Sequence, residues 1–175
     1  MTLYKYSSHR VDDIEDVTQY LTWEPHETPK VSRDFIQQMT EARETGETAS
    51  YVVRPKAGED GAGEFAGLTG LSVDWDRRAG TLGMWLRKPF WGRGYSGERA
   101  SELFRVAFER LDLDVVAVEC DVDNEKSRRA IEKYIESHGG RQEGTLRNCA
   151  DHGDGPATVH RYSVTQAEYR EAVEN

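Results

Sequence analysis

The chain has 175 residues and a mass of 19.9 kDa, which favours a single domain with one sizeable core. The sequence contains no run of about 18 apolar residues, so we expect neither a membrane-spanning helix nor a membrane partner. The formal net charge of −9 argues against nucleic acid as the main partner, because neutralising phosphates requires a basic surface.

The first ten residues alternate polar and aromatic side chains and lack the apolar stretch of a secretory signal, so we expect a cytoplasmic protein. The two cysteines, Cys120 and Cys149, have no CxxC spacing. This argues against a metal site and against a disulfide framework. We expect both to be small residues within strands.

The first half of the chain predicts two helices and three strands. The expected elements, in chain order, are helices over residues 11–21 and 32–45, a strand over 50–54, and strands over 65–76 and 81–87. The last two strands flank a short polar segment, which predicts an antiparallel hairpin. The Gly-rich, charged segment before them, residues 55–63, is typical of a surface loop.

The second half contains the clearest helix of the sequence. The expected elements are a helix over 97–111, a strand over 115–122, a helix over 124–138 ended by Gly139 and Gly140, strands over 141–149 and 157–164 around a turn over 151–155, and a short last helix. Thr165 and Glu168 form the capping-box pattern of that last helix.

A Gly-rich turn, WGRGYSG at residues 91–97, lies between a predicted strand and the clearest helix. Glycine allows a tight turn, so that successive N–H groups and the positive end of the helix point at one anion. A pyrophosphate suits this arrangement. We expect the backbone amides from Arg93 to Gly97 to bind it, with the Arg93 side chain adding charge.

Two other interpretations of the turn remain open. Gly92, Gly94 and Gly97 satisfy the GxGxxG pattern of dinucleotide-binding folds, and Glu119 follows at about the spacing expected for the acidic residue. A dinucleotide fold needs parallel βαβ units on both sides, whereas this turn follows a hairpin late in a short chain. The turn could also do no more than start a helix.

The stretch TLGMWLRKPFWGRGYSGERASELFRVAFERLDLDVVAVECDVDNEKSRRAIEK resembles the GCN5-related N-acetyltransferase (GNAT) superfamily, and within it the ribosomal-protein N-terminal acetyltransferase (RimJ/RimL-like) branch. The resemblance is strongest over residues 81–147. It implies one α/β domain over residues 1–175 with the acyl-CoA N-acyltransferase fold, a mixed and mostly antiparallel sheet flanked by helices. It also implies acetyl-CoA as cosubstrate, no metal, and a possible homodimer.

The resemblance assigns a set of residues to the cofactor. They are Leu86, Arg87, Trp91, Gly92, Arg93, Gly94, Tyr95, Ser96, Gly97, Asn124 and Ser127. The broad superfamily pattern would place Gln or Arg at Trp91 and Gly or Ala at Ser96, so the amide cradle is better supported than side-chain contacts. Asn124 would contact the cofactor arm, and it is equally suited to cap a helix.

Acetyl transfer requires a neutral amine, a polarised thioester carbonyl and a proton for the departing thiolate. The resemblance places a backbone N–H near Leu86 or Arg87 at the carbonyl. Many members use a tyrosine for the thiolate, but Ile131 occupies that position and Tyr134 is better explained as a core residue. Ser127 is then the candidate acid. Glu119 is a candidate base, acting directly or through water, and solvent is the alternative.

The acceptor is expected to be a primary amine, most favourably a protein N-terminal α-amine. A small-molecule amine such as a polyamine, amino acid or aminoglycoside is the first alternative, and a non-catalytic module that binds coenzyme A is the second. In the segment between the first two helices, Trp23 is a candidate wall of the acceptor pocket. His26, in an acidic loop beside proline, is expected to be a surface residue.

Overall fold

The computed structural model of the chain describes residues 2–151 and 155–174. The helices are α1 (Thr2–Ser7), α2 (Ile14–Thr18), α3 (Pro29–Glu44), α4 (Tyr95–Arg105), α5 (Glu125–Ser137) and α6 (Gln166–Glu174). The strands are β1 (Thr48–Val53), β2 (Gly67–Asp74), β3 (Ala79–Leu86), β4 (Val115–Asp121), β5 (Arg141–Asp151) and β6 (Pro156–Thr165). A 3-10 turn, Lys88–Phe90, precedes α4, and a π-helical turn, Val106–Arg110, continues it.

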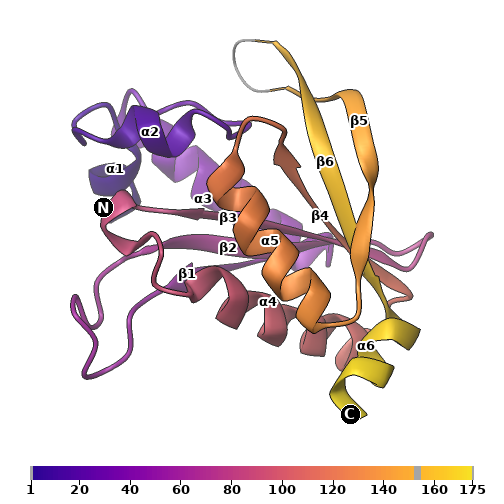
Figure 1. Cartoon of the computed structure of the whole chain (residues 1–175). Helices are drawn as coiled ribbons and strands as arrows, with labels where there is room; N and C mark the ends of the chain where they lie inside the picture. Colours follow the sequence, from indigo (N-terminus) through magenta and orange to yellow (C-terminus); the bar gives the residue numbers. More distant parts are fainter. Residues whose placement is uncertain (1, 152–154, 175) are drawn as a thin grey trace.

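The six strands form one sheet in the order β1-β2-β3-β4-β6-β5 (Figure 1). Neighbouring strands pair antiparallel except β3 and β4, which run parallel. The expected mixed, mostly antiparallel α/β fold is therefore confirmed. Because β3 and β4 are parallel, they end at the same edge of the sheet, and each is followed by a helix that starts at that edge.

The helices cover the two faces of the sheet separately (Figure 1). On one face, α4 and α5 bury the main core, in which Phe104, Val116 and Ile135 are almost completely shielded. On the other face, the segment from α1 to α3 packs over β2 and β3 around Phe65 and Trp85. We call these the α4–α5 face and the α1–α3 face.

Parallel pairing between β3 and β4 stops half-way along the strands. Residues 79–82 of β3 pair with residues 115–118 of β4. Beyond Leu82 and Val118, β3 remains paired with β2 and β4 remains paired with β6, but the two strands no longer pair with each other. The strands therefore splay apart over Gly83–Leu86 and Glu119–Asp121, and we call this opening the splay.

Most predicted elements are confirmed, but one helix was missed and the bounds of others differ. Helix α1 was not predicted, because its alternating polar and aromatic residues lack a clear helical stripe. The helix expected over 11–21 is limited to α2, and the turn expected over 151–155 lies mostly outside the described residues. The capping box is confirmed, since the Thr165 amide donates to Glu168 Oε2 at 2.8 Å and the Glu168 amide donates to Thr165 Oγ1 at 3.3 Å.

Both cysteines lie on strands, as expected. Cys120 is buried in β4, where burial raises its thiol pKa to about 11, and Cys149 is exposed on β5. Within the described ranges, none of the helices is long and apolar enough to cross a membrane.

The β2–β3 hairpin that carries one side of the splay depends on a glycine. A Cβ added at Gly67 would overlap the carbonyl oxygen of Trp85 on the neighbouring strand. Gly67→Ala should therefore lower the free energy of unfolding by about 1–3 kcal/mol, measured by urea denaturation. Gly83→Ala is the matched control, because a Cβ at Gly83 meets no atom within 4 Å. Equal stability of the two variants would contradict the close approach.

Candidate functional site

Helix α4 begins without a side-chain cap. Its N-cap residue, Gly94, has a left-handed backbone with φ of +86°, and Gly92 before it has φ of +74°, so both positions favour glycine. The carbonyl oxygen of Gly94 accepts from the amide of Gly97 at 3.0 Å. Among the described residues, the amides of Tyr95 and Ser96 have no such backbone partner. The Gly97 amide is therefore not available to a ligand, because it is bonded within the first turn of α4. The predicted set of free amides is smaller by that one donor.

Gly97 itself is not explained by packing. It lies in the first turn of α4 with an ordinary φ, and a Cβ there would meet no protein atom within 4 Å. Glycine at this position makes α4 less stable than alanine would, although the protein has room for alanine. The space beside Gly97 is open to a ligand.

The surface loop over residues 55–63 is linked by hydrogen bonds to the Gly-rich turn. Asp60 accepts from the Arg93 guanidinium, Nη2 to Oδ2 at 3.1 Å, and Glu59 accepts from the Tyr95 hydroxyl at 2.5 Å. The hydrogen bond to Glu59 raises the pKa of Tyr95. Arg93, which was expected to contact phosphate oxygens, is thus paired with Asp60. A phosphate group would have to compete with this carboxylate for the guanidinium.

Asn124 caps α5 and keeps part of its side chain available. Its Oδ1 accepts from the amide of Ser127 at 3.0 Å, which confirms the capping role. The side-chain N–H groups of Asn124 and the hydroxyl of Ser127 have no hydrogen-bond partner among the described residues. Both can therefore serve a ligand without loss of the cap.

Two contacts hold the start of α5 against the segment that precedes α4. The ammonium group of Lys126 lies 4.8 Å from the centre of the Trp91 ring. The Trp91 indole N–H in turn donates to the carbonyl oxygen of Leu86 at 2.8 Å. The starts of α4 and α5 and the end of β3 are therefore tied together around the splay.

Arg87 is less available than its predicted role requires. Its amide donates to the carbonyl oxygen of Ala66 at 2.8 Å, and its guanidinium donates to the carbonyl oxygen of Phe65 at 2.8 Å. The guanidinium also lies 4.1 Å from the centre of the Tyr6 ring. Of the two backbone positions expected at the thioester carbonyl, Leu86 is the better candidate.

Glu119 lies on the α1–α3 face at the beginning of the splay. Its neighbours Val118 and Cys120 point into the core on the α4–α5 face, and successive side chains of a strand alternate. Its Oε1 accepts from Arg161 Nη1 on β6 at 2.5 Å. The structure therefore places a carboxylate, accompanied by an arginine, where the two strands separate.

Ile131 and Tyr134 both belong to the main core, which confirms the expectation that Tyr134 is a core residue. The Tyr134 ring packs against Phe104 with 6.3 Å between ring centres.

His26 is not a surface residue, and that expectation was wrong. Only 6% of the residue is exposed. Its Nδ1 lies 3.0 Å from Ser7 Oγ on α1 and 2.6 Å from Ser32 Oγ on α3. The Ser7 hydroxyl also donates to the carbonyl oxygen of Leu3 at 2.9 Å, so α1, α3 and the imidazole share one buried hydrogen-bond cluster. The acidic, Pro-flanked loop gave no local signal, because both serines are distant in sequence.

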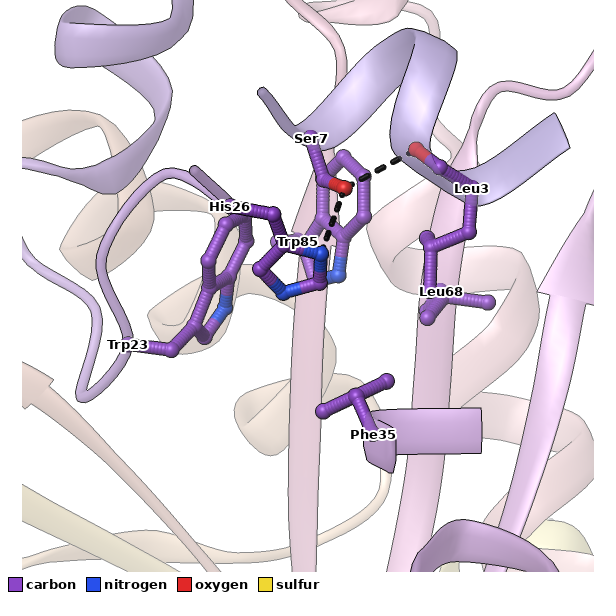
Figure 2. Close-up of a pocket in the computed structure, with 7 residues that line it drawn as sticks. All are labelled: Leu3, Ser7, Trp23, His26, Phe35, Leu68 and Trp85. Atoms are coloured by element: carbon purple, nitrogen blue, oxygen red, sulfur yellow. Dashed lines mark hydrogen bonds between the residues drawn. The ribbon is translucent and has the colours of Figure 1, made fainter. Parts of the chain in front are cut away.

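His26 lines a small cavity on the α1–α3 face, shown in Figure 2. Its volume is about 10 Å³, close to the space that one water molecule occupies. The lining residues are Leu3, Ser7, Trp23, His26, Phe35, Leu68 and Trp85. The rings of Trp23 and Trp85 meet edge to face at 5.3 Å, so Trp23 lines this cavity beside strand β3, and its place in an acceptor pocket stays a prediction.

The comparison with protein families decides what this architecture is. A family model described as "Acetyltransferase (GNAT) domain" matches residues 6–134, well over half of the chain. The chain belongs to the GNAT acetyltransferase family. The match includes the Gly-rich turn, the splay and the first three turns of α5.

Two curated GNAT relatives are similar in sequence. The "Uncharacterized N-acetyltransferase p20" of Bacillus licheniformis is 23% identical over 155 residues, which cover 88% of this chain and 83% of that protein. The "Putative ribosomal N-acetyltransferase YdaF" of Bacillus subtilis strain 168 is 36% identical over 72 residues, which cover 41% of this chain and 39% of that protein.

Solved structures share the GNAT fold. The microcin C7 self-immunity acetyltransferase MccE, in complex with acetyl-CoA and AMP, has a TM-score of 0.79 at 19% identity and covers 94% of this chain and 85% of its own. Spermidine N-acetyltransferase from Vibrio cholerae, with CoA and spermine, has a TM-score of 0.73 at 16% identity over 96% and 90%. The ribosomal L7/L12 α-N-protein acetyltransferase RimL has a TM-score of 0.70 at 19% identity over 85% and 76%.

The residues at the start of α4 fit the cofactor that the family implies. A pyrophosphate needs several N–H donors directed at one point, and the uncapped amides of Tyr95 and Ser96 supply them at the positive end of a helix. The open side of Gly97 leaves space for the approach. Acetyl-CoA is therefore compatible with the donors and the space that this chain presents.

Gly97→Ala separates stability from binding. Alanine fits the protein and favours a helix, so the free energy of unfolding should rise by about 0.5–1 kcal/mol in urea denaturation. The added methyl group occupies the open space, so affinity for coenzyme A should fall in calorimetry. Ser101→Ala, on the exposed side of the same helix, is the control and should leave the affinity unchanged. An unchanged affinity in Gly97→Ala would show that no ligand approaches there.

Stability should also depend on pH through His26. Burial lowers its pKa below the ordinary value of 6.5. As pH falls through 6.5, the unfolded chain binds a proton before the native protein does, so stability is lost progressively between that pH and the lower native pKa. The urea midpoint should fall from pH 7.5 to pH 5.5, and less so in His26→Asn, which keeps an N–H donor near Ser7. His9→Asn, at an exposed position, should retain the full decrease. If His26→Asn retained it too, His26 would not be its source.

Proposed function

We propose that the protein is an acetyl-CoA-dependent N-acetyltransferase that acts on a primary amine, most favourably the α-amine of a protein N-terminus, as in the RimJ/RimL-like branch. The observation that carries this proposal is the uncapped start of α4 beside the splay between β3 and β4. Free amides suited to a pyrophosphate and an unpaired strand edge suited to an extended arm occur together only there among the described elements.

When bound, acetyl-CoA supplies an activated acetyl group on sulfur. The amides of Tyr95 and Ser96 hold its phosphates, and the unpaired edge of β3 around Leu86 positions its arm. The free N–H groups of Asn124 add a contact at the start of α5. These residues orient the reacting carbonyl and require no metal ligands from the chain.

Two side chains are placed to move protons. Ser127 has a hydroxyl without another described partner at the start of α5, and it donates a proton to the departing sulfur. Glu119 lies on the opposite side of the splay, on the α1–α3 face, and accepts the proton that the amine loses. Arg161 donates to the Glu119 carboxylate at 2.5 Å and fixes its position on the strand. Acid and base thus act from opposite faces of the sheet.

The choice of an α-amine is supported by chemistry and by similarity. An α-amine has a pKa of about 8, against about 10.4 for lysine, so its neutral form is more available to a site whose candidate base is the half-buried Glu119. RimL shares the fold, and the ribosomal N-acetyltransferase relative from B. subtilis shares 36% identity over the matched segment. Spermidine N-acetyltransferase also shares the fold, which keeps a small amine as the second candidate.

A panel of acceptors tests the proposal. The purified protein with acetyl-CoA should release thiol with peptides that carry a free α-amine, and mass spectrometry should locate the acetyl group at the N-terminus. Peptides with a blocked α-amine and an internal lysine should react much more slowly. Ser127→Ala should lower kcat at saturating acetyl-CoA by about 10-fold or more, whereas Ser137→Ala, at the far end of α5, should not.

Two results would contradict the proposal in different ways. Faster transfer to spermidine or another small amine than to every peptide would contradict the protein α-amine as acceptor, while acetyl transfer from acetyl-CoA to an amine would still hold. Tight binding of coenzyme A without acetylated product, from the panel and from a cell extract, would make the protein a binding module instead.

A further inference from the structure

Arg99 lies in the second turn of α4 with an unusual set of contacts. Its Nη2 donates to the Tyr134 hydroxyl on α5 at 3.3 Å, and its guanidinium lies 5.5 Å from the centre of the Tyr134 ring. The other two nitrogen atoms, Nε and Nη1, are shielded from solvent and have no hydrogen-bond partner within the part of the chain that the structure describes. Part of the side chain still reaches the surface.

This arrangement is unfavourable for the protein alone. Burial lowers the pKa of Arg99, partly offset by Tyr134, and no carboxylate contributes. Arginine nevertheless keeps its charge in proteins, so the guanidinium remains a cation with unmet donors. An unpaired buried charge destabilises the folded state, and an apolar side chain of similar length would avoid the penalty.

The side chain reaches toward the start of its own helix. Side chains on an α-helix lean toward the N-terminus, so Arg99 on α4 and Tyr134 on α5 both lean toward the edge of the sheet where these helices begin. Within α4, Arg99 lies four residues after Tyr95, about one helical turn from the uncapped amides. An oxygen-rich anion held by those amides would supply acceptor oxygens about one helical turn from Arg99.

We propose that Arg99 is a cofactor-binding residue that donates hydrogen bonds to a phosphate oxygen of acetyl-CoA held at the start of α4. This inference rests on the proposed function. Because Nε and Nη1 are shielded without the ligand, binding requires the side chain to rotate away from Tyr134 toward the helix start. The unmet donors make that rotation favourable once an acceptor oxygen is present. Arg99 therefore trades stability of the ligand-free protein for affinity.

Arg99→Met tests whether Arg99 lowers the stability of the ligand-free protein and raises its affinity for the cofactor. The two measurements do not depend on activity. The melting temperature of the ligand-free variant should rise by a few degrees, because the unmet charge is gone. Its dissociation constant for coenzyme A in calorimetry should rise by about 10- to 100-fold, the range of a charge-assisted hydrogen bond. S-acetylpantetheine, which lacks the pyrophosphate, should bind both proteins equally.

Matched variants keep the test specific. Arg105→Met removes an exposed arginine of the same helix, which pairs with Glu102 at 2.8 Å. This variant should neither raise the melting temperature nor weaken the binding of coenzyme A. Arg99→Lys keeps the charge and should recover part of the affinity. These comparisons exclude a general effect of removing a positive charge from α4.

Specific results would overturn the inference. A lower melting temperature of Arg99→Met with unchanged affinity would make Arg99 a packing residue. An equal loss of affinity for coenzyme A and for S-acetylpantetheine would place the contact away from the phosphate. If the wild-type protein bound no coenzyme A, the proposed function itself would fail. If the wild-type protein and Arg99→Met bound coenzyme A equally well, only the role of Arg99 would fail.

Discussion

The short parallel pairing of β3 with β4 is the constraint on which the rest of the site depends. Parallel strands require a crossover, and here the crossover is the Gly-rich turn and α4. Because both strands run in the same direction, α4 and α5 start at one edge of the sheet. Because the pairing ends at Leu82 and Val118, the same edge contains an opening with unpaired backbone on both sides.

Several unsatisfied groups of the described residues lie near that edge, although the buried Ser8 hydroxyl, which also lacks a partner, lies elsewhere. The first amides of α4 lack a cap, the shielded nitrogen atoms of Arg99 lack an acceptor, and Gly97 leaves open space that packing does not require. Two of the other helices are capped, α5 by Asn124 and α6 by its capping box, whereas α2 and α3 also start without a side-chain cap. A folded protein normally pairs its buried polar groups, so the shielded donors of Arg99, one turn from uncapped amides and beside open space at Gly97, are a physical indication of a ligand site.

The α1–α3 face contributes a different environment. Trp23, Trp85 and His26 make an aromatic region beside β3, while Glu119 and Arg161 make a charged one beside the splay. The two regions lie on the same face of the sheet and differ in polarity. An acceptor that presents an amine and an apolar neighbour would find suitable surroundings for both.

The strong periodic segments of the sequence were sufficient to predict the hairpin, α4, β4, α5 and the capping box, because these depend on local spacing and cap chemistry. Helix α1 and the burial of His26 were not predictable. His26 is buried because Ser7 and Ser32, from two separate helices, meet its ring, and no local pattern encodes such a meeting. The same holds for the pairing of Arg93 with Asp60 across the loop.

The sequence by itself determined the family and the cap at Asn124 and predicted an anion-binding turn, since each resides in a few consecutive residues. Tertiary structure alone decided which amides remain free, where the strands separate, and that Glu119 and Arg99 face opposite sides of the sheet. Those properties arise from pairing between distant strands and from packing between helices. Such pairings depend on the whole fold and not on any local segment.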